Sequence, residues 1–502
     1  MVSTTGVDQN KINLFSFTGK MKILHMSWLA FFISFVVWFN FAPLMESIRQ
    51  TFGLSNQEVK LLLILNVALT IPARIVIGML VDKYGPKITF SVLLAVASAF
   101  CFLFAFADSY EKLAIYRFVL GFVGSGFVIG IRLVSEWFPA KQVGTAEGIY
   151  GGWGNFGSAA AAISLPTIAL WVGGDDGWRW AVASTGVLSL VFSFIFYFSV
   201  SDNPKGTTYF RPKNLGAMEV TSKGDFLLYC LMTAPLYLAL AVLAWKIGPA
   251  NLHIFSAIAT SVVYLTLLVL YVYQVLQIYR INKGVFAPDA KPVAEIHRYK
   301  FKQVAVLDLA YMVTFGSELA VISMLPLFFF DTFKTTAHLS ITQAALVASV
   351  FAGLNLFMRP AGGILSDKFG RKKTLVVVLA GLAGGYFLMG QIDGSWSIPA
   401  AIAVMIIASI FVNAGNGAVY AVVPLVKRRL TGQVAGMAGA YGNVGGVTFL
   451  TVLSFVSPQI FFITIACAAV VVFLITLLVL DEPKGFMYEE NDDGSIEKIE
   501  LH

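Results

Sequence analysis

Long apolar stretches recur along the chain from residue 22 to residue 480 and are separated by short polar loops. A helix that crosses about 30 Å of hydrocarbon needs about 20 mostly apolar residues. The pattern therefore predicts fourteen membrane-spanning helices, at residues 22–45, 58–80, 87–107, 114–136, 147–171, 179–199, 225–245, 252–279, 303–330, 343–365, 374–391, 398–426, 434–456 and 458–480. Such a chain is an all-α polytopic membrane protein.

The composition agrees with this class, because 58% of the residues are hydrophobic and only 13% are charged. Soluble proteins carry roughly a quarter charged residues. The net charge of +7 would suit a nucleic-acid ligand, but the basic residues lie in loops. With both termini in the cytoplasm, the inner segments hold 25 Lys and Arg and the outer loops hold six. Since cytoplasmic loops carry the basic excess, we expect cytoplasmic termini and a multi-pass plasma-membrane protein in contact with lipid, not nucleic acid.

One loop segment occurs twice. The residues Gly-Met-Leu-Val-Asp-Lys-Tyr-Gly, which begin at Gly78, return 285 positions later as Gly-Ile-Leu-Ser-Asp-Lys-Phe-Gly. In each copy an arginine stands eight residues before the aspartate: Arg74 precedes Asp82, and Arg359 precedes Asp367.

Glycines at every third position also occur twice, and each set is called a glycine row below. An asparagine follows the third glycine of each row, Asn155 in the first and Asn443 in the second. The second row lies 288 positions after the first, so the two matches have nearly the same offset and indicate two homologous halves. Small residues at this spacing let membrane helices pack closely. The rows are Gly148, Gly151, Gly154 and Gly157, and Gly436, Gly439, Gly442 and Gly445.

The repeat also predicts how the chain is divided. We expect a cytoplasmic N-terminal tail (1–21) without a signal-peptide cleavage site, a six-helix bundle (22–200), a central insert with two extra spans and cytoplasmic linkers (201–302), a second six-helix bundle (303–480) and a cytoplasmic C-terminal tail (481–502). Parallel six-helix repeats are typical of secondary transporters, which bind substrate between the repeats near the membrane midplane.

The repeated loops and glycine rows resemble those of a known family. The Gly-x-x-x-Asp-Lys-x-Gly loops resemble the signature of the major facilitator superfamily, and the glycine rows with their asparagines resemble the paired nitrate signatures of its nitrate/nitrite porter branch. Residues 22–43 and the central insert are most similar to cyanobacterial nitrate permeases. The resemblance implies the major facilitator fold with two six-helix bundles. It also implies a secondary active transporter that takes up nitrate and nitrite by alternating access.

The two repeated arginines are the first candidates for the substrate site. An arginine within a span is costly, by about 2.5–3.5 kcal/mol on insertion scales, and is by default a functional-site candidate. Arg74 and Arg359 hold equivalent positions in the two halves, so they are expected to face each other across a central cavity. A guanidinium offers a planar fork of donors that fits a flat anion such as nitrate. The structural alternative is that each arginine pairs with an internal carboxylate.

Polar and aromatic residues complete the expected site. Close packing of the glycine rows would bring the amide groups of Asn155 and Asn443 toward the cavity, where they can donate to an anion; otherwise they bond neighbouring helices. Asn416 is a weaker polar candidate. The resemblance also implies four aromatic residues around the substrate, which are Phe35, Phe127, Tyr311 and Phe315.

Glu318 decides the expected mechanism, because it lies near the middle of the span 303–330. We expect it either to couple transport to protons or to lock helices by pairing with Arg117 or a polar neighbour. Asp308 is a lesser coupling candidate. Nitrate entry against an inside-negative potential costs about 2.3 kcal/mol per 100 mV. Accumulation therefore needs a coupling ion or a counter-anion, and Glu318 favours proton symport.

The remaining motifs concern the cytoplasmic gate and the absence of metal-binding and catalytic patterns. Arg132 and Glu136, four residues apart and close in depth to Asp82, are expected to form a latch on the cytoplasmic side, and Asp367 holds the equivalent gating position in the second half. The five histidines show no ligand spacing, and the chain has no Walker loop or catalytic triad. We therefore expect no enzyme activity, no metal site and no cofactor.

Three rival functions stay open at this stage. The protein could exchange nitrate for nitrite or carry another small anion. It could be a nitrate-sensing receptor, with a regulatory protein docked on the cytoplasmic linkers 201–224 and 280–302. It could also be a channel, although two gated halves around an arginine site suit stepwise transport better.

Overall fold

The structure is a computed structural model of the chain. It describes residues 12–174, 176–207, 209, 211, 216–250, 255–286, 298–336, 338–339, 341–490 and 496–500. The helices are α1 (Gly19–Phe39), α2 (Met45–Phe52), α3 (Asn56–Ala68), α4 (Thr70–Tyr84), α5 (Pro86–Ala105), α6 (Tyr110–Leu120), α7 (Gly126–Trp137), α8 (Ala140–Val172), α9 (Gly177–Ser199), α10 (Lys223–Ile247), α11 (Ala257–Ile281), α12 (Phe301–Phe333), α13 (Ile341–Gly353), α14 (Asn355–Phe369), α15 (Arg371–Met389), α16 (Ile398–Tyr420), α17 (Thr431–Leu453) and α18 (Pro458–Val479).

Short 3-10 helices and one hairpin complete the described elements. The 3-10 helices are η1 (Ala42–Leu44), η2 (Gly121–Ser125), η3 (Lys283–Phe286), η5 (Val423–Leu425) and η6 (Arg428–Leu430). Strands β1 (Phe486–Glu490) and β2 (Ile496–Glu500) pair antiparallel. The sequence did not predict this hairpin, which lies beyond the last apolar stretch, so the all-α prediction holds for the membrane part of the chain.

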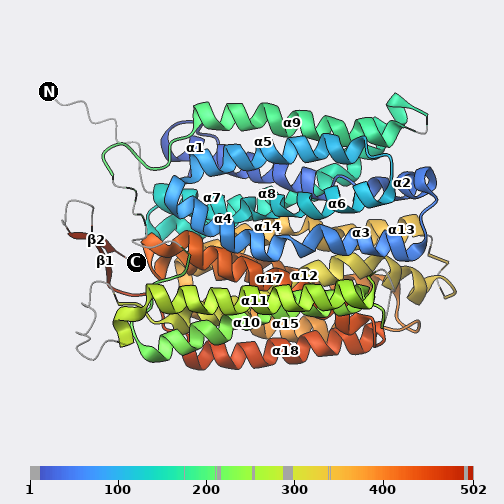
Figure 1. Ribbon diagram of the computed structural model, residues 1–502. Helices are drawn as coiled ribbons and strands as arrows, with labels where there is room; N and C mark the ends of the chain where they lie inside the picture. The colour runs from blue at the N-terminus through green and yellow to red at the C-terminus, as the bar shows by residue number, and fades with distance from the viewer. Residues whose placement is uncertain are drawn as a thin grey trace.

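The long helices run side by side in one bundle of two halves (Figure 1). Within the first half α1 packs on α8 and α5 on α9, and within the second half α12 packs on α17 and α15 on α18. The halves meet through crossed pairs, since α8 of the first half lies against α14 of the second, and α17 of the second lies against α4 of the first. The glycine rows lie on α8 and α17, and the two repeated arginines lie on α4 and α14.

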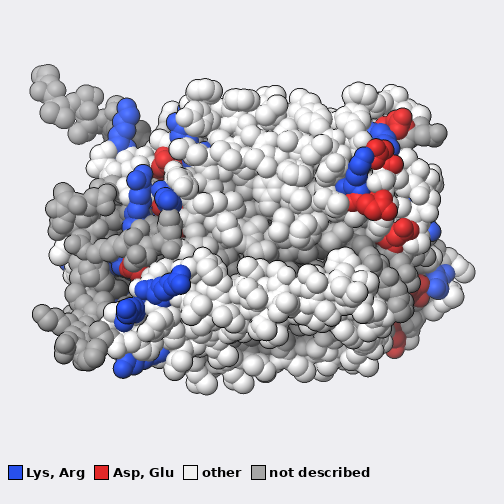
Figure 2. Space-filling model, in the orientation of Figure 1, with Lys and Arg blue, Asp and Glu red and all other residues white. Residues whose placement is uncertain are grey.

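Among the described residues, thirteen segments are long and apolar enough to cross a membrane. They match thirteen of the predicted spans. The remaining predicted span, 434–456, corresponds to α17, which is helical and mostly buried but does not reach the same mean hydropathy. The prediction of fourteen spans therefore stays a prediction. Figure 2 shows the charged residues of the visible face at the two ends of the bundle, with a broad uncharged surface between them.

The second span of each half is interrupted at equivalent positions. Helix α3 ends at Ala68 and α4 begins at Thr70, whereas α13 ends at Gly353 and α14 begins at Asn355. Each break falls about one helical turn before the repeated arginine of that half. The apolar pattern runs through both positions, so the sequence predicted continuous helices where the structure has two shorter ones.

The two extra helices lie beside the second half. Helix α10 packs against α12 and α17, with a smaller contact to α3 of the first half. It is tied to α17 by Tyr441, whose hydroxyl donates to the carbonyl of Met232 at 2.5 Å. Helix α11 packs on α10, and most of its apolar side chains are exposed. Helices α10 and α11 therefore lie on the outside of the second half, and α10 also reaches α3 of the first half.

Candidate functional site

Arg74 and Arg359 lie inside the bundle, where 0% and 1% of their surfaces are exposed. They interact electrostatically with each other. Arg74 donates from Nη1 to the carbonyl of Gly439 at 2.5 Å, and Arg359 donates from Nη2 to the Tyr311 hydroxyl at 3.1 Å. Among the described residues neither arginine forms an ion pair with a carboxylate. The structural alternative, in which each arginine pairs with a carboxylate, is not what the fold adopts.

Aromatic rings fill the space around the two guanidinium groups. Phe127 lies within cation–π distance of both, with its ring centroid 5.7 Å from Cζ of Arg74 and 4.8 Å from Cζ of Arg359. Tyr311 stacks on Phe127 at 6.2 Å and on Phe315 at 5.0 Å between centroids. Three of the four predicted aromatic residues therefore meet at the arginines.

Phe35, the fourth predicted aromatic residue, lies one layer further out. Its ring contacts Phe31 at 4.7 Å, and Phe31 in turn contacts Phe127 at 5.2 Å. The pair Phe31 and Phe35 thus backs the aromatic cluster from α1. No ring contact joins Phe35 directly to Phe127, Tyr311 or Phe315 in the described part of the chain.

Each glycine row lies against the arginine of the opposite half. A Cβ on Gly151 would fall 2.5 Å from Nε of Arg359, and a Cβ on Gly439 would fall 3.0 Å from Cδ of Arg74. One turn earlier in each row, a Cβ on Gly148 would come similarly close to the backbone carbonyl of Arg359, and a Cβ on Gly436 to that of Arg74. The rows therefore do more than let helices pack, because they leave the room in which both arginine side chains lie.

Replacing Gly151 with alanine should displace the Arg359 guanidinium. We expect the Gly151→Ala variant to lose at least about tenfold in transport, since misplacing a binding group by about 1 Å can cost up to about 100-fold. The measurement is uptake per inserted molecule in proteoliposomes. Gly384→Ala is the matched control, because Gly384 lies exposed on α15 and its Cβ would meet nothing within 4 Å. Normal uptake by Gly151→Ala would contradict the crossed packing.

The two row asparagines are buried and only partly bonded. Neither amide atom of Asn155 has a hydrogen-bond partner among the described residues. Nδ2 of Asn443 donates to the carbonyl of Gly439 at 3.4 Å, while its Oδ1 has no partner there. Nη1 of Arg359 is likewise buried without an acceptor. Buried polar atoms are almost always bonded in native proteins, so this group of unbonded donors and acceptors, two N–H donors and two amide oxygens, is typical of a ligand site.

Glu318 of α12 accepts hydrogen bonds from two amides. Nδ2 of Asn416 donates to Oε2 at 2.5 Å, and Nδ2 of Asn355 donates to Oε1. Glu318 also interacts electrostatically with Arg359. Arg117, its suggested partner, instead donates to the side chains of Asn40 and Asn66 at 3.0 Å each. The suggested pairing with Arg117 is therefore wrong, because that arginine is held by neutral carbonyls within the first half.

Asp308 has no electrostatic interaction with either arginine. It is fully buried on α12, its carboxylate has no hydrogen-bond partner among the described residues, and the groups with which it interacts are Tyr229, Tyr420 and Tyr441. A buried carboxylate without donors or a cation is stable only when it is neutral.

Replacing Asp308 with asparagine should therefore change little. We expect Asp308→Asn to keep nitrate uptake, and its response to a proton gradient, within about twofold of the unmodified protein, because both side chains are neutral and similar in shape. Uptake under an imposed gradient measures this. A loss of the response to protons in Asp308→Asn would instead make this residue the coupling acid.

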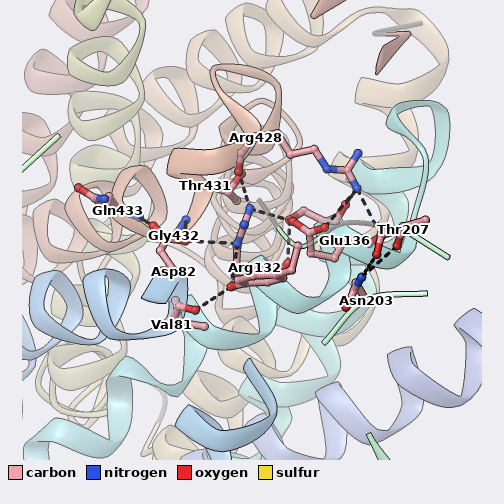
Figure 3. A network of polar contacts seen from close by, with 12 residues as sticks. Val81, Asp82, Arg132, Glu136, Asn203, Thr207, Arg428, Thr431, Gly432 and Gln433 are labelled. Atoms are coloured by element: carbon pink, nitrogen blue, oxygen red, sulfur yellow. Dashed lines mark hydrogen bonds and ion pairs between the residues drawn. The ribbon is translucent and has the colours of Figure 1, made fainter. Parts of the chain in front are cut away.

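Asp82 joins the first half to the start of α17 (Figure 3). Its carboxylate accepts from the backbone N–H groups of Gly432 at 3.1 Å and Gln433 at 3.0 Å, and it pairs with Nε of Arg132 at 3.2 Å. Free N–H groups in the first turn of a helix favour a carboxylate at that position. Arg132 also pairs with Glu136 at 2.9 Å.

Asp367 makes the equivalent contact in the opposite direction. It accepts from the backbone N–H groups of Gly144 at 3.2 Å and Thr145 at 2.7 Å, on α8 of the first half. Arg371 pairs with Asp367 at 3.2 Å and donates to the carbonyl of Ala140 at 2.5 Å. We call these two sets of contacts the latch, and the end of the bundle at which they lie the latched end. All four predicted gating residues, Asp82, Asp367, Arg132 and Glu136, belong to it.

Sequence reasoning missed three residues at this site. Tyr420 packs its edge on Phe127 at 4.5 Å, and Tyr150 stacks on Phe127 at 5.9 Å between centroids. Glu147 is 1% exposed and interacts electrostatically with Arg359. Two of them could have been found by helical spacing, because Tyr420 lies one turn after Asn416 and Glu147 lies one turn before Gly151.

Comparison with known proteins places this architecture in a family. The family described as Major Facilitator Superfamily matches residues 27–287 and 307–494. The nitrate/nitrite transporter NrtP of Picosynechococcus is 44% identical over 96% of this chain and 97% of its own length. The transporter of the same name from Nostoc punctiforme is 43% identical over 94% of each chain. The E. coli fucose:proton symporter FucP has the same fold, with a TM-score of 0.62 at 12% identity over 92% of this chain and 100% of that chain.

These findings confirm the resemblance and the fold inferred from the sequence. They also confirm that the protein is a multi-pass membrane transporter and not an enzyme, because the family consists of transporters. The chain therefore belongs to the major facilitator superfamily and, within it, to the nitrate/nitrite porter family.

Proposed function

We propose that this protein takes up nitrate and nitrite across the plasma membrane by alternating access and couples uptake to protons. The observation that carries the proposal is the pair of buried arginines that have no carboxylate partner among the described residues, where Nη1 of Arg359 also has no acceptor. A buried cation is strongly destabilising unless it is paired. A small anion between Arg74 and Arg359 would supply that pairing.

The shape of the site favours a flat, delocalised anion. The rings of Phe127 and Tyr311 are parallel, with an interplanar angle of 1°, and Arg359 lies over Phe127. Such walls keep water out and strengthen the contact between guanidinium and anion by lowering the local dielectric constant. Asn155 and Asn443 lie on the glycine rows and would donate amide N–H groups to the oxygens of the anion. The similarity to two NrtP transporters over nearly the whole chain supports nitrate and nitrite as the anions.

Glu318 supplies a route for proton coupling. When it is ionised, its negative charge competes with the anion for Arg359; when it is protonated, the arginine is free to bind the anion. Proton and nitrate would then bind cooperatively, because each raises the affinity for the other by the same factor. The latch joins the two halves at one end of the bundle, and alternating access requires that its contacts break when the loaded halves rock.

Uptake of labelled nitrate into proteoliposomes tests this function. We expect uptake that follows an imposed inward proton gradient without any anion inside. Uptake that occurs only after nitrite or nitrate is loaded inside would show an exchanger. Binding without uptake in either assay would show a receptor, and unitary currents would show a channel.

A further inference from the structure

Helix α8 presents one face to α14 on which three features follow in order. Gly144 lies against the latch carboxylate of Asp367, and Gly151 lies against the guanidinium of Arg359. Glu147 is three residues after the first of these glycines and four before the second. Residues three and four apart share a face of a helix, so Glu147 lies between the latch and the substrate arginine.

Glu147 is buried and has no assigned role. It is 1% exposed, and neither carboxylate oxygen has a hydrogen-bond partner among the described residues. The charged groups that interact with it are Asp367 and Arg359, both on α14, and Tyr150 on its own helix also lies within electrostatic range. An ionised carboxylate is costly to bury without hydrogen-bond donors, and among the described residues no ion pair joins Glu147 to Arg359.

We propose that Glu147 is the internal counter-ion that replaces the transported anion on Arg359 when the transporter is empty. Opening the latch breaks the contact of Asp367 with Gly144 and Thr145, one turn from Glu147, and lets water reach that part of α8. Glu147 then ionises and releases its proton to that water. Its carboxylate approaches Arg359 once the anion has left.

The physical need for such a group follows from the two arginines. Two facing cations repel each other, so the empty halves resist closure, and the bound anion removes this resistance. During exchange the halves never have to close around an empty site, because an anion is bound both when the transporter moves inward and when it returns outward. Net uptake does require it, and Glu147 would provide the missing negative charge. This role rests on the function proposed above and explains how that function can be net uptake.

Glu147→Gln separates the two modes of transport. Glutamine keeps the shape and neutrality that the side chain has in the latched state, but it cannot ionise. We expect net nitrate uptake into anion-free proteoliposomes to fall at least tenfold, while exchange of labelled nitrate against internal nitrate stays within twofold of the unmodified protein. Nitrate binding to the purified protein, and its dependence on pH, should be unchanged. Glu111→Gln is the matched control, because Glu111 is exposed at the start of α6.

Each other result has a definite meaning. Equal losses of net uptake and exchange would overturn the counter-ion role and show that Glu147 only supports the packing of α8. Unchanged rates in both assays would overturn it as well, while leaving nitrate transport intact. An unmodified protein that moves no nitrate in either assay would overturn the proposed function itself, together with the role that rests on it.

Discussion

Replacing Arg74 or Arg359 with lysine is expected to lower nitrate uptake by about 100-fold while the protein still folds and inserts. Lysine keeps the positive charge but loses the planar fork that can hold two oxygens of one anion. A hydrogen bond to a charged group contributes about 1.5–3 kcal/mol, and a loss of about 3 kcal/mol corresponds to roughly 100-fold in affinity. Uptake per inserted molecule and nitrate binding to the purified variants measure the effect.

The geometry suggests which variant will be affected more strongly. Arg359 has a free donor at Nη1, whereas Arg74 is already bonded to the carbonyls of Gly439 and Gly124. We therefore expect the larger loss of binding in Arg359→Lys. Arg280→Lys is the control, because Arg280 is exposed at the end of α11. Near-normal nitrate uptake in both site variants would refute the two-oxygen contact.

Glu318→Gln is expected to bind nitrate but to lose the response of transport to protons. In the unmodified protein, lowering the pH protonates Glu318, removes a negative charge near Arg359 and so raises nitrate affinity; raising the pH has the opposite effect. Glutamine carries no charge at any pH, so the nitrate affinity of the variant should vary little between about pH 6 and pH 8. It should resemble the low-pH affinity of the unmodified protein.

Two measurements check the role of Glu318. Nitrate binding across this pH range shows whether the dependence on pH has gone, and uptake under an imposed proton gradient shows whether coupling has gone. Asp308→Asn is the matched control, since it also replaces a buried acid of α12 with the corresponding amide, and no electrostatic interaction joins Asp308 to either arginine. If Glu318→Gln still takes up nitrate in response to a proton gradient, Glu318 does not couple transport to protons, and its role beside Asn355 and Asn416 is purely structural.

Much of the fold could be read from the sequence because membrane insertion imposes a simple rule. A span must be apolar over about 20 residues, so the helices appear directly as apolar stretches. The breaks at Leu69 and Leu354 left no such signal, because the single polar residue after each, Thr70 and Asn355, does not end the apolar stretch. The terminal hairpin was missed for a related reason. Its strands lie beyond the last apolar stretch, so the requirement for about 20 apolar residues does not mark them.

The site was only partly predictable from the same information. Repetition at one offset marked Arg74, Arg359 and the row asparagines, because two homologous halves keep equivalent positions. It gave no indication that each row lies against the arginine of the other half, which depends on how the halves pack. Glu147 has no counterpart in the second half, where the equivalent position is Ala435. A search guided by repetition therefore passed over it.

The sequence by itself determined that this chain spans a membrane many times, consists of two related halves and places two arginines at equivalent depths. Those properties depend on composition and spacing, which are local. Only the tertiary structure decided that the two arginines pair with no carboxylate in the described part of the chain, that Glu318 is held by two amides, and that Phe35 lies behind the aromatic cluster. These contacts join helices that are far apart in the sequence. They depend on how the helices and the two halves pack together, which the sequence of a single segment does not reveal.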